Sequence, residues 1–207
     1  MRACPENRSE PLAALLAKVR ACSACAGALP LGPRPVLQLS ASATVLVASQ
    51  APGSKVHQTG VPFSDASGDR LREWMSLSAD EFYDEERIAI LPMGFCYPGR
   101  TGGGDAPPRA ECVHLWRDQL LQLLPDVRLT LLVGSYAQHH VLGPGAITPR
   151  VRNFRDYLPA YFPLPHPSWR SRIWEEKNPW FARQVLPALR SAIEGALSGR
   201  QTSSGSK

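Results

Sequence analysis

Four runs of mainly apolar residues stand out along the chain. Thr44–Ala48 reads Thr-Val-Leu-Val-Ala and has no polar residue at alternate positions. A strand without such alternation is buried on both faces, as in a parallel sheet that lies between helices. The other runs are Ile88–Met93, Leu129–Val133 and Tyr161–Leu164. We therefore predict four strands of one buried parallel sheet.

The segments around these runs carry apolar residues at helical spacing. Within residues 9–21, Leu12, Leu15, Leu16 and Val19 form a stripe along one side of a helix. The other predicted helices are Gly68–Leu77, Arg109–Leu124, Ser135–Leu142 and Asn178–Leu197. Because alternating strands and helices are typical of doubly covered sheets, the pattern predicts an α/β fold, a three-layer α/β/α sandwich with a central four-stranded parallel sheet.

The length bounds the domain organisation. A chain of 207 residues can bury one complete core, so we predict a single domain over residues 1–197. The Ser- and Gly-rich residues 198–207 are predicted to be a disordered tail. No stretch is apolar enough to span a bilayer, and acidic residues interrupt the N-terminus where a signal peptide would be apolar. We expect a cytoplasmic monomer with no membrane partner.

Three predicted strands end in loops rich in Gly, Pro, His and aromatic residues. The first loop begins Ser-Gln-Ala-Pro-Gly at residues 49–53, the second spans 94–104, and the third is Pro165–Arg170. The carboxyl ends of parallel strands lie at one edge of a sheet, where open α/β folds bind their ligands. We therefore predict one composite pocket. The net charge of +5 favours a polyanionic partner for it.

Four of the five cysteines form two spaced pairs. Cys22 and Cys25 are separated by two residues, and Cys96 and Cys112 by fifteen; Cys4 is left over as a thiol. In a cytoplasmic protein such residues are thiols or metal ligands rather than disulfides. Four thiolates suit a [4Fe-4S] cluster or zinc. The alternative is that they are small buried residues that bind no metal.

The order and spacing of several motifs resemble the uracil-DNA glycosylase superfamily, most closely its iron–sulfur branch, family four. The motifs are Gln50–Gly53, Gly60–Phe63, a strand ending near Cys96, and His166–Ser168. Phe63 follows Gln50 by thirteen residues, as it would in that branch. Three segments are also similar to a less characterised bacterial subgroup: Gln50–Trp74, Pro92–Gly99 and Lys177–Phe181. The resemblance runs from Cys22 to Leu197 and implies iron rather than zinc at the four cysteines.

The resemblance also implies roles for pocket residues in excising uracil, or another deaminated base, from DNA. Breaking the N-glycosidic bond leaves negative charge on the departing base, which needs a hydrogen-bond donor. His166 is the implied donor, and Ser168 of the same turn is implied to bind the base. Backbone amides of Gln50 and Ala51 would hold the base, and the Phe63 ring would stack on it. The alternatives are a surface turn for His166 and plain core packing for Phe63.

Three positions depart from the family pattern. Gln50 stands where family four has its catalytic acid, and Ala51 where another branch has an aspartate. Pro92 replaces the asparagine that reads uracil in the relatives. Glutamine can orient water but cannot accept its proton. Another acid must then serve, unless catalysis relies on stabilising the leaving group alone.

Three aspartates lie in loops that we expect to reach the pocket. Asp65 ranks first because it follows the stacking ring by two residues, whereas Asp69 and Asp105 are weaker candidates. Helix capping is the alternative role for Asp65 and Asp69, and a solvated loop position for Asp105. His57 is a further candidate for positioning water.

Contacts with DNA are expected just after the histidine turn. Trp169 is large enough to enter the space that a flipped base leaves, and Arg170 and Arg172 can neutralise phosphates. We thus predict a monofunctional DNA glycosylase acting in base excision repair. The alternative is a catalytically weak nucleic-acid-binding or redox-sensing iron–sulfur module on the same scaffold.

Overall fold

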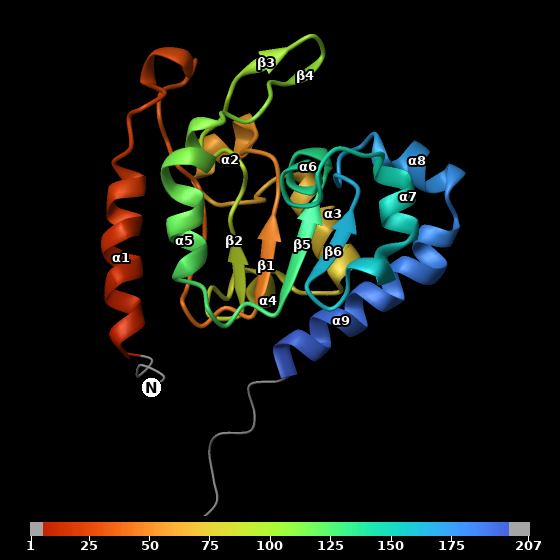
Figure 1. Cartoon of the computed structure of the whole chain (residues 1–207). Helices are drawn as coiled ribbons and strands as arrows, with labels where there is room; N and C mark the ends of the chain where they lie inside the picture. Colours follow the sequence, from red (N-terminus) through yellow and green to blue (C-terminus); the bar gives the residue numbers. More distant parts are fainter. Residues whose placement is uncertain (1–5, 199–207) are drawn as a thin grey trace, which may run out of the picture.

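The computed structural model describes residues 6–198, which are built around one four-stranded sheet (Figure 1). Its strands are β1 (Val45–Ala48), β2 (Ile88–Ile90), β5 (Leu129–Val133) and β6 (Tyr161–Leu164). All pairings are parallel, and the spatial order is β2-β1-β5-β6. Val47 of β1 lies beside Ile90 on one side and Leu131 on the other. The predicted parallel sheet is confirmed.

Helices cover both faces of this sheet. Every residue of β1, β2 and β5 is buried, which is why these strands show no polar alternation. Val45 and Val47 pack on one layer, and Leu46, which points the opposite way, packs on the other. The first layer includes α3 (Ala66–Met75), α4 (Ala79–Tyr83) and α9 (Leu186–Ser198). The second includes α1 (Glu6–Arg20), α5 (Asp118–Gln122) and α6 (Ser135–Leu142). The three-layer α/β/α sandwich is confirmed.

The predicted helices are present, with altered bounds. The helix predicted at 109–124 is a π-helical segment, Val113–Arg117, that continues into α5. The helix predicted at 178–197 likewise begins with a π-helical segment, Phe181–Val185, and continues as α9. Residue periodicity identifies an apolar face, but it does not distinguish these closely related helical geometries.

Several short elements are not predicted by the spacing of apolar residues. They are α2 (Ser54–Thr59), α4, α7 (Ile147–Arg152), α8 (Ser171–Lys177), the 3₁₀ turns Ala26–Ala28 and Phe154–Tyr157, and the hairpin of β3 (Arg100–Thr101) and β4 (Gly104–Asp105). Helices of one or two turns are too short to repeat an apolar face, and tertiary contacts stabilise them. The hairpin replaces an expected loop. Its turn residues Gly102 and Gly103 both have positive φ, as the tight two-residue hairpin turn requires.

The ends of the chain limit what the structure describes. The predicted tail, 198–207, lies outside the described residues except for Ser198, the last residue of α9. Within residues 6–198, no helix combines the length and the apolar character needed to cross a membrane.

Candidate active site

A cavity lies beyond the carboxyl ends of the parallel strands. In Figure 1 all four strand arrows point to the same edge, and α2 and the β3–β4 hairpin stand above it. From β1 the chain continues to β2 on one side of the sheet and later to β5 on the other side, so the strand order reverses at β1. Open α/β sheets bind ligands in the crevice at such a reversal. The cavity has a volume of about 70 Å³.

Five of the predicted site residues line this cavity. They are Gln50, Ala51, Phe63, Asp65 and His166. They come from the loops after β1 and β6, so residues far apart in sequence meet at one edge of the sheet. Pro92, at the position of the relatives' asparagine, also lines the cavity. The single composite pocket predicted from the strand ends is therefore present.

His166 is held by hydrogen bonds to its own carbonyl group. The backbone N–H of Ser168 donates to the His166 carbonyl oxygen at 2.9 Å, and the Ser171 hydroxyl donates to the same atom. Burial lowers the pKa of the His166 imidazole, and the opposing effect of Asp65 is smaller. A neutral imidazole still carries one N–H group, so His166 can act as a donor without bearing a charge.

Phe63 has an unusual backbone conformation that orients its ring. Its φ is +55°, and its carbonyl oxygen accepts hydrogen bonds from the Tyr83 hydroxyl at 3.2 Å and from Arg72 at 3.4 Å. A Cβ at Gly68 would lie 1.7 Å from that oxygen, so only glycine fits there. The ring lines the cavity and also packs edge-on against Phe82, with 6.1 Å between centroids. The ring thus packs on the core, as the alternative for Phe63 expected, and it is also accessible from the cavity, where stacking on a base would take place.

The three candidate aspartates lie in different surroundings. Asp65 is the N-cap of α3: its Oδ1 accepts from the Gly68 N–H at 3.0 Å. Asp69 is exposed and forms an ion pair with Arg72, so it does not face the cavity. Asp105, in the hairpin strand β4, lines the cavity. Capping is confirmed for Asp65, whereas Asp69 pairs with Arg72 instead of capping the helix. Asp105 is exposed, as a solvated position would be, but it belongs to a hairpin strand that reaches the cavity rather than to a loop.

Asp105 is the site residue that sequence reasoning undervalued. Burial is the main cause that raises the pKa of its carboxyl group; Asp65 raises it further, and Arg100 acts in the opposite direction. The available signal was the Gly102–Gly103 pair, which is typical of a two-residue hairpin. Recognising that turn would have predicted that the chain folds back toward the cavity.

His57 lies beside the cavity rather than in its wall. It is on α2, and its ring is 6.2 Å from that of Tyr97, tilted by 54°. Its Nδ1 atom is buried and has no hydrogen-bond partner among the described residues. The structure therefore does not bring His57 together with the five lining residues.

Arg117 is a buried cation that supports the cavity from below. Its side chain is in the core, and its Nη1 donates to the carbonyl oxygens of Leu91 at 3.1 Å and Pro92 at 3.3 Å. Burial lowers the pKa of this guanidinium to about 10. The sequence places Arg117 in a helix but does not indicate that its side chain points inward. It holds the chain where β2 leads into the cavity wall.

The segment after the histidine turn forms an exposed rim. Trp169 is 71% exposed, and the Arg170 guanidinium lies 5.3 Å from the centroid of its ring. Arg170 also donates to the carbonyl oxygen of Gly103 at 2.8 Å, which connects this segment to the hairpin. Arg172 is exposed as well. Ser168 contributes through its backbone to the histidine turn and is not among the residues that line the cavity.

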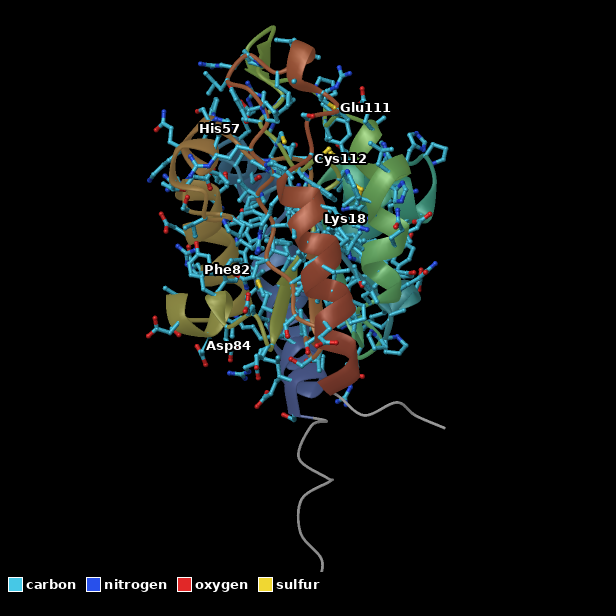
Figure 2. The ribbon with its side chains drawn as sticks, turned by 90° about the vertical axis from the view of Figure 1, so that its left-hand side faces the viewer. Lys18, His57, Phe82, Asp84, Glu111 and Cys112 are labelled. Atoms are coloured by element: carbon cyan, nitrogen blue, oxygen red, sulfur yellow. The ribbon has the colours of Figure 1, made fainter. Side chains whose placement is uncertain are left out.

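The four paired cysteines line a second cavity. Cys22 and Cys25 follow α1, Cys96 lies in the loop after β2, and Cys112 immediately precedes Val113. The cavity has a volume of about 20 Å³ and mostly apolar walls. Figure 2 shows Cys112 at the loop end of the molecule, above the labelled Lys18 of α1.

Burial affects the chemistry of these thiols. It raises the pKa of Cys96, and that of Cys112 to about 11. The Phe95 N–H donates to the Cys112 Sγ at 3.4 Å, a contact that also suits a metal-bound thiolate. Within the described part of the chain, no three His, Cys, Asp or Glu side chains are arranged to hold a metal ion. The structure thus brings the four cysteines to one cavity without forming a single-ion site.

Comparison with known proteins agrees with this architecture. Residues 38–190 match the family model described as the uracil DNA glycosylase superfamily. The match includes the strands, the cavity loops, Cys96 and Cys112, and it begins after Cys22 and Cys25. Since the match extends over most of the sequence, the chain belongs to the uracil DNA glycosylase superfamily.

Proposed function

We propose that this protein is a monofunctional DNA glycosylase that removes uracil, or another deaminated base, by hydrolysing its N-glycosidic bond. The observation that carries the proposal is the content of one cavity: the aromatic ring of Phe63, the neutral donor His166, and the carboxylates of Asp65 and Asp105. Superfamily membership supports the same class of reaction.

Each group suits one part of this reaction. As the bond breaks, the base gains negative charge, and a hydrogen bond from His166 would stabilise it more than it stabilises the bound substrate. The Phe63 ring would stack on the flipped base, and the backbone of Gln50 and Ala51 would contact its edge. Carboxylates and an imidazole act on water, which favours hydrolysis over Schiff-base chemistry.

We further propose that Cys22, Cys25, Cys96 and Cys112 hold a [4Fe-4S] cluster. Four thiols around one apolar cavity, with a backbone N–H directed at one sulfur, fit such a group. In a cubane cluster each thiolate binds a different iron, so the sulfurs need not converge on one point as they must around zinc. The cluster would supply a covalent link between the segment after α1 and the core.

The choice of base follows from what lines the cavity. Pro92 offers no side-chain amide, so backbone groups and His166 would have to read the base. Such readout suits several bases, because each deaminated base carries a carbonyl oxygen on its ring system. We propose a deaminated base in cytoplasmic DNA as the substrate, with Trp169, Arg170 and Arg172 contacting the strand and the protein acting as a monomer.

A second candidate function rests on Gln50. This residue lies in the cavity where family four has an acid, and a glutamine cannot accept a proton from water. A glutamine at this position would also be expected in a protein that binds nucleic acid without efficient catalysis. The same holds for one that senses redox state through a cluster.

Alkaline cleavage of oligonucleotides after incubation with the protein separates these functions. Single- and double-stranded substrates carry uracil, hypoxanthine or xanthine at one position. We expect wild-type protein to release at least one of these bases. His166→Ala should reduce the single-turnover rate on the order of a hundredfold with little change in DNA affinity. His114→Ala, at an exposed position outside the cavity, is the matched control. Absence of release from every substrate would contradict the glycosylase assignment.

A further inference from the structure

Two carboxylate oxygens lie close to the position that a Cβ would take at Gly53. A Cβ added at Gly53 would lie 3.5 Å from Oδ2 of Asp105 and 3.7 Å from Oδ2 of Asp65. Gly53 itself lines the cavity, together with both aspartates and His166. The space above the Gly53 Cα is therefore bounded by two acidic oxygen atoms.

The tertiary structure fixes Asp105 at this position. Asp105 pairs with Arg100 across the hairpin, and the hairpin turn is bound by Arg170, which donates to the Gly103 carbonyl oxygen at 2.8 Å. Arg170 belongs to the segment that follows His166, so the same loop system holds both the hairpin and the histidine. Asp105 is thus placed in the cavity by an element remote from it in sequence.

The two aspartates are not equivalent. Oδ1 of Asp65 already accepts the N–H of Gly68 as the cap of α3, which leaves Oδ2 toward Gly53. Burial and the nearby Asp65 raise the pKa of Asp105, so its carboxylate accepts a proton more readily than an unperturbed aspartate does.

We propose that Asp105 is the general base of the glycosylase, and that it and Asp65 hold the hydrolytic water between them over Gly53. This inference rests on the function proposed above and deepens it. The water oxygen bonds to C1′ of the sugar, and one water proton passes to the Asp105 carboxylate. The bond from C1′ to the base nitrogen breaks, and its electron pair leaves with the base, whose oxygen accepts a hydrogen bond from His166. The base takes a proton from solvent, to which Asp105 returns its own.

This assignment predicts a particular pH dependence. The charged groups that act on Asp105 are Asp65 and Arg100. Arg170 lies next to the neighbouring Gly104, and His166 lines the same cavity. Since the pKa of Asp105 is raised, excision should fall on the acid side at a higher pH than it would with an unperturbed aspartate. Asp105→Asn should remove that acid limb and lower the single-turnover rate on the order of a hundredfold or more.

The thermal stability of the same variant gives an independent readout. Above the folded pKa, Asp105 is ionised in both states, and its raised pKa means that the folded state holds that charge less favourably than the unfolded chain does. Asp105→Asn should therefore keep or raise the melting temperature at neutral pH while activity is lost. A carboxylate with a merely structural role would show the reverse.

Gly53→Ala tests the water position without removing either acid. Gly53 has a φ of −77°, which alanine adopts readily, and the added methyl group would make ordinary contacts with both carboxylates. The methyl group occupies the space proposed for water, so we expect a loss of about tenfold or more in rate. Asp80→Asn, in the exposed first turn of α4, is the matched control.

The experiment measures single-turnover excision from pH 4 to 9, DNA affinity and melting temperature for these proteins, on whichever base wild-type protein releases fastest. Loss of rate and of the acid limb in Asp105→Asn, with DNA affinity retained, supports the proposal. An active wild type with an equally active Asp105→Asn or Gly53→Ala variant overturns it and leaves the glycosylase function intact. If Asp105→Asn does not fold, Gly53→Ala decides. A wild type inactive on every base overturns both proposals.

Discussion

Replacing Phe63 with leucine tests whether its ring is a stacking surface or only part of the core. Leucine preserves most of the apolar contact with the core cluster and removes the flat aromatic face. The positive φ of Phe63 costs about the same for either side chain, because both carry a Cβ, so backbone strain cancels in the comparison. The substitution therefore isolates the aromatic face.

The expected magnitudes differ for stability and for base binding. The lost edge-on contact with Phe82 is worth about 0.5–1.5 kcal/mol, which lowers the melting temperature by a few degrees. Stacking of a base on an aromatic ring is worth about 1–3 kcal/mol, or roughly 5–150-fold in affinity. The free energy of base binding should thus fall by as much as the free energy of unfolding, or by more.

The assay compares the affinity of each protein for an oligonucleotide that carries the target base and for one with an abasic position. The ratio of the two affinities reports contacts with the base alone. In Phe63→Leu this ratio should fall, with the excision rate falling alongside it. Phe82→Leu is the control, since Phe82 is fully buried and does not line the cavity; it should lose stability with less change in the ratio. An unchanged ratio in Phe63→Leu would show that the ring only fills the core.

Two further predictions concern the second cavity and the rim. Protein purified without oxygen should be brown and contain about four irons per chain. Cys96→Ala should lose the colour and have a lower melting temperature, because the cluster would join the segment after α1 to the loop after β2. Iron analysis and visible absorption check this, and a colourless wild type or one containing zinc would contradict it. Trp169→Ala should weaken binding of base-containing DNA by about tenfold without destabilising the fold, since this side chain is 71% exposed. Titration by fluorescence anisotropy measures the loss, Ile173→Ala on the neighbouring exposed position is the control, and equal affinities for wild type and Trp169→Ala would exclude a contact with DNA.

The sequence alone determined the central sheet and its covering layers. Runs such as Thr44–Ala48 and Leu129–Val133 lack polar alternation because both faces of each strand are buried. The sequence of the strand itself therefore indicates this burial. Parallel strands then require that their loops meet at one edge, so Gln50, Phe63 and His166 could be expected together before any coordinates were known. The cap at Asp65 was likewise local, since it depends on a residue only three positions away.

Only the tertiary structure decided which polar residues enter the cavity. Asp105 reaches it because a glycine turn folds β4 back and Arg170, from another loop, holds that turn. His57 is on α2, and its ring lies near that of Tyr97 rather than in the wall of the cavity. Both outcomes depend on contacts between segments distant in sequence, whose geometry no local pattern encodes. The sheet follows from burial summed along each strand, whereas the site depends on where single side chains point once the loops have packed.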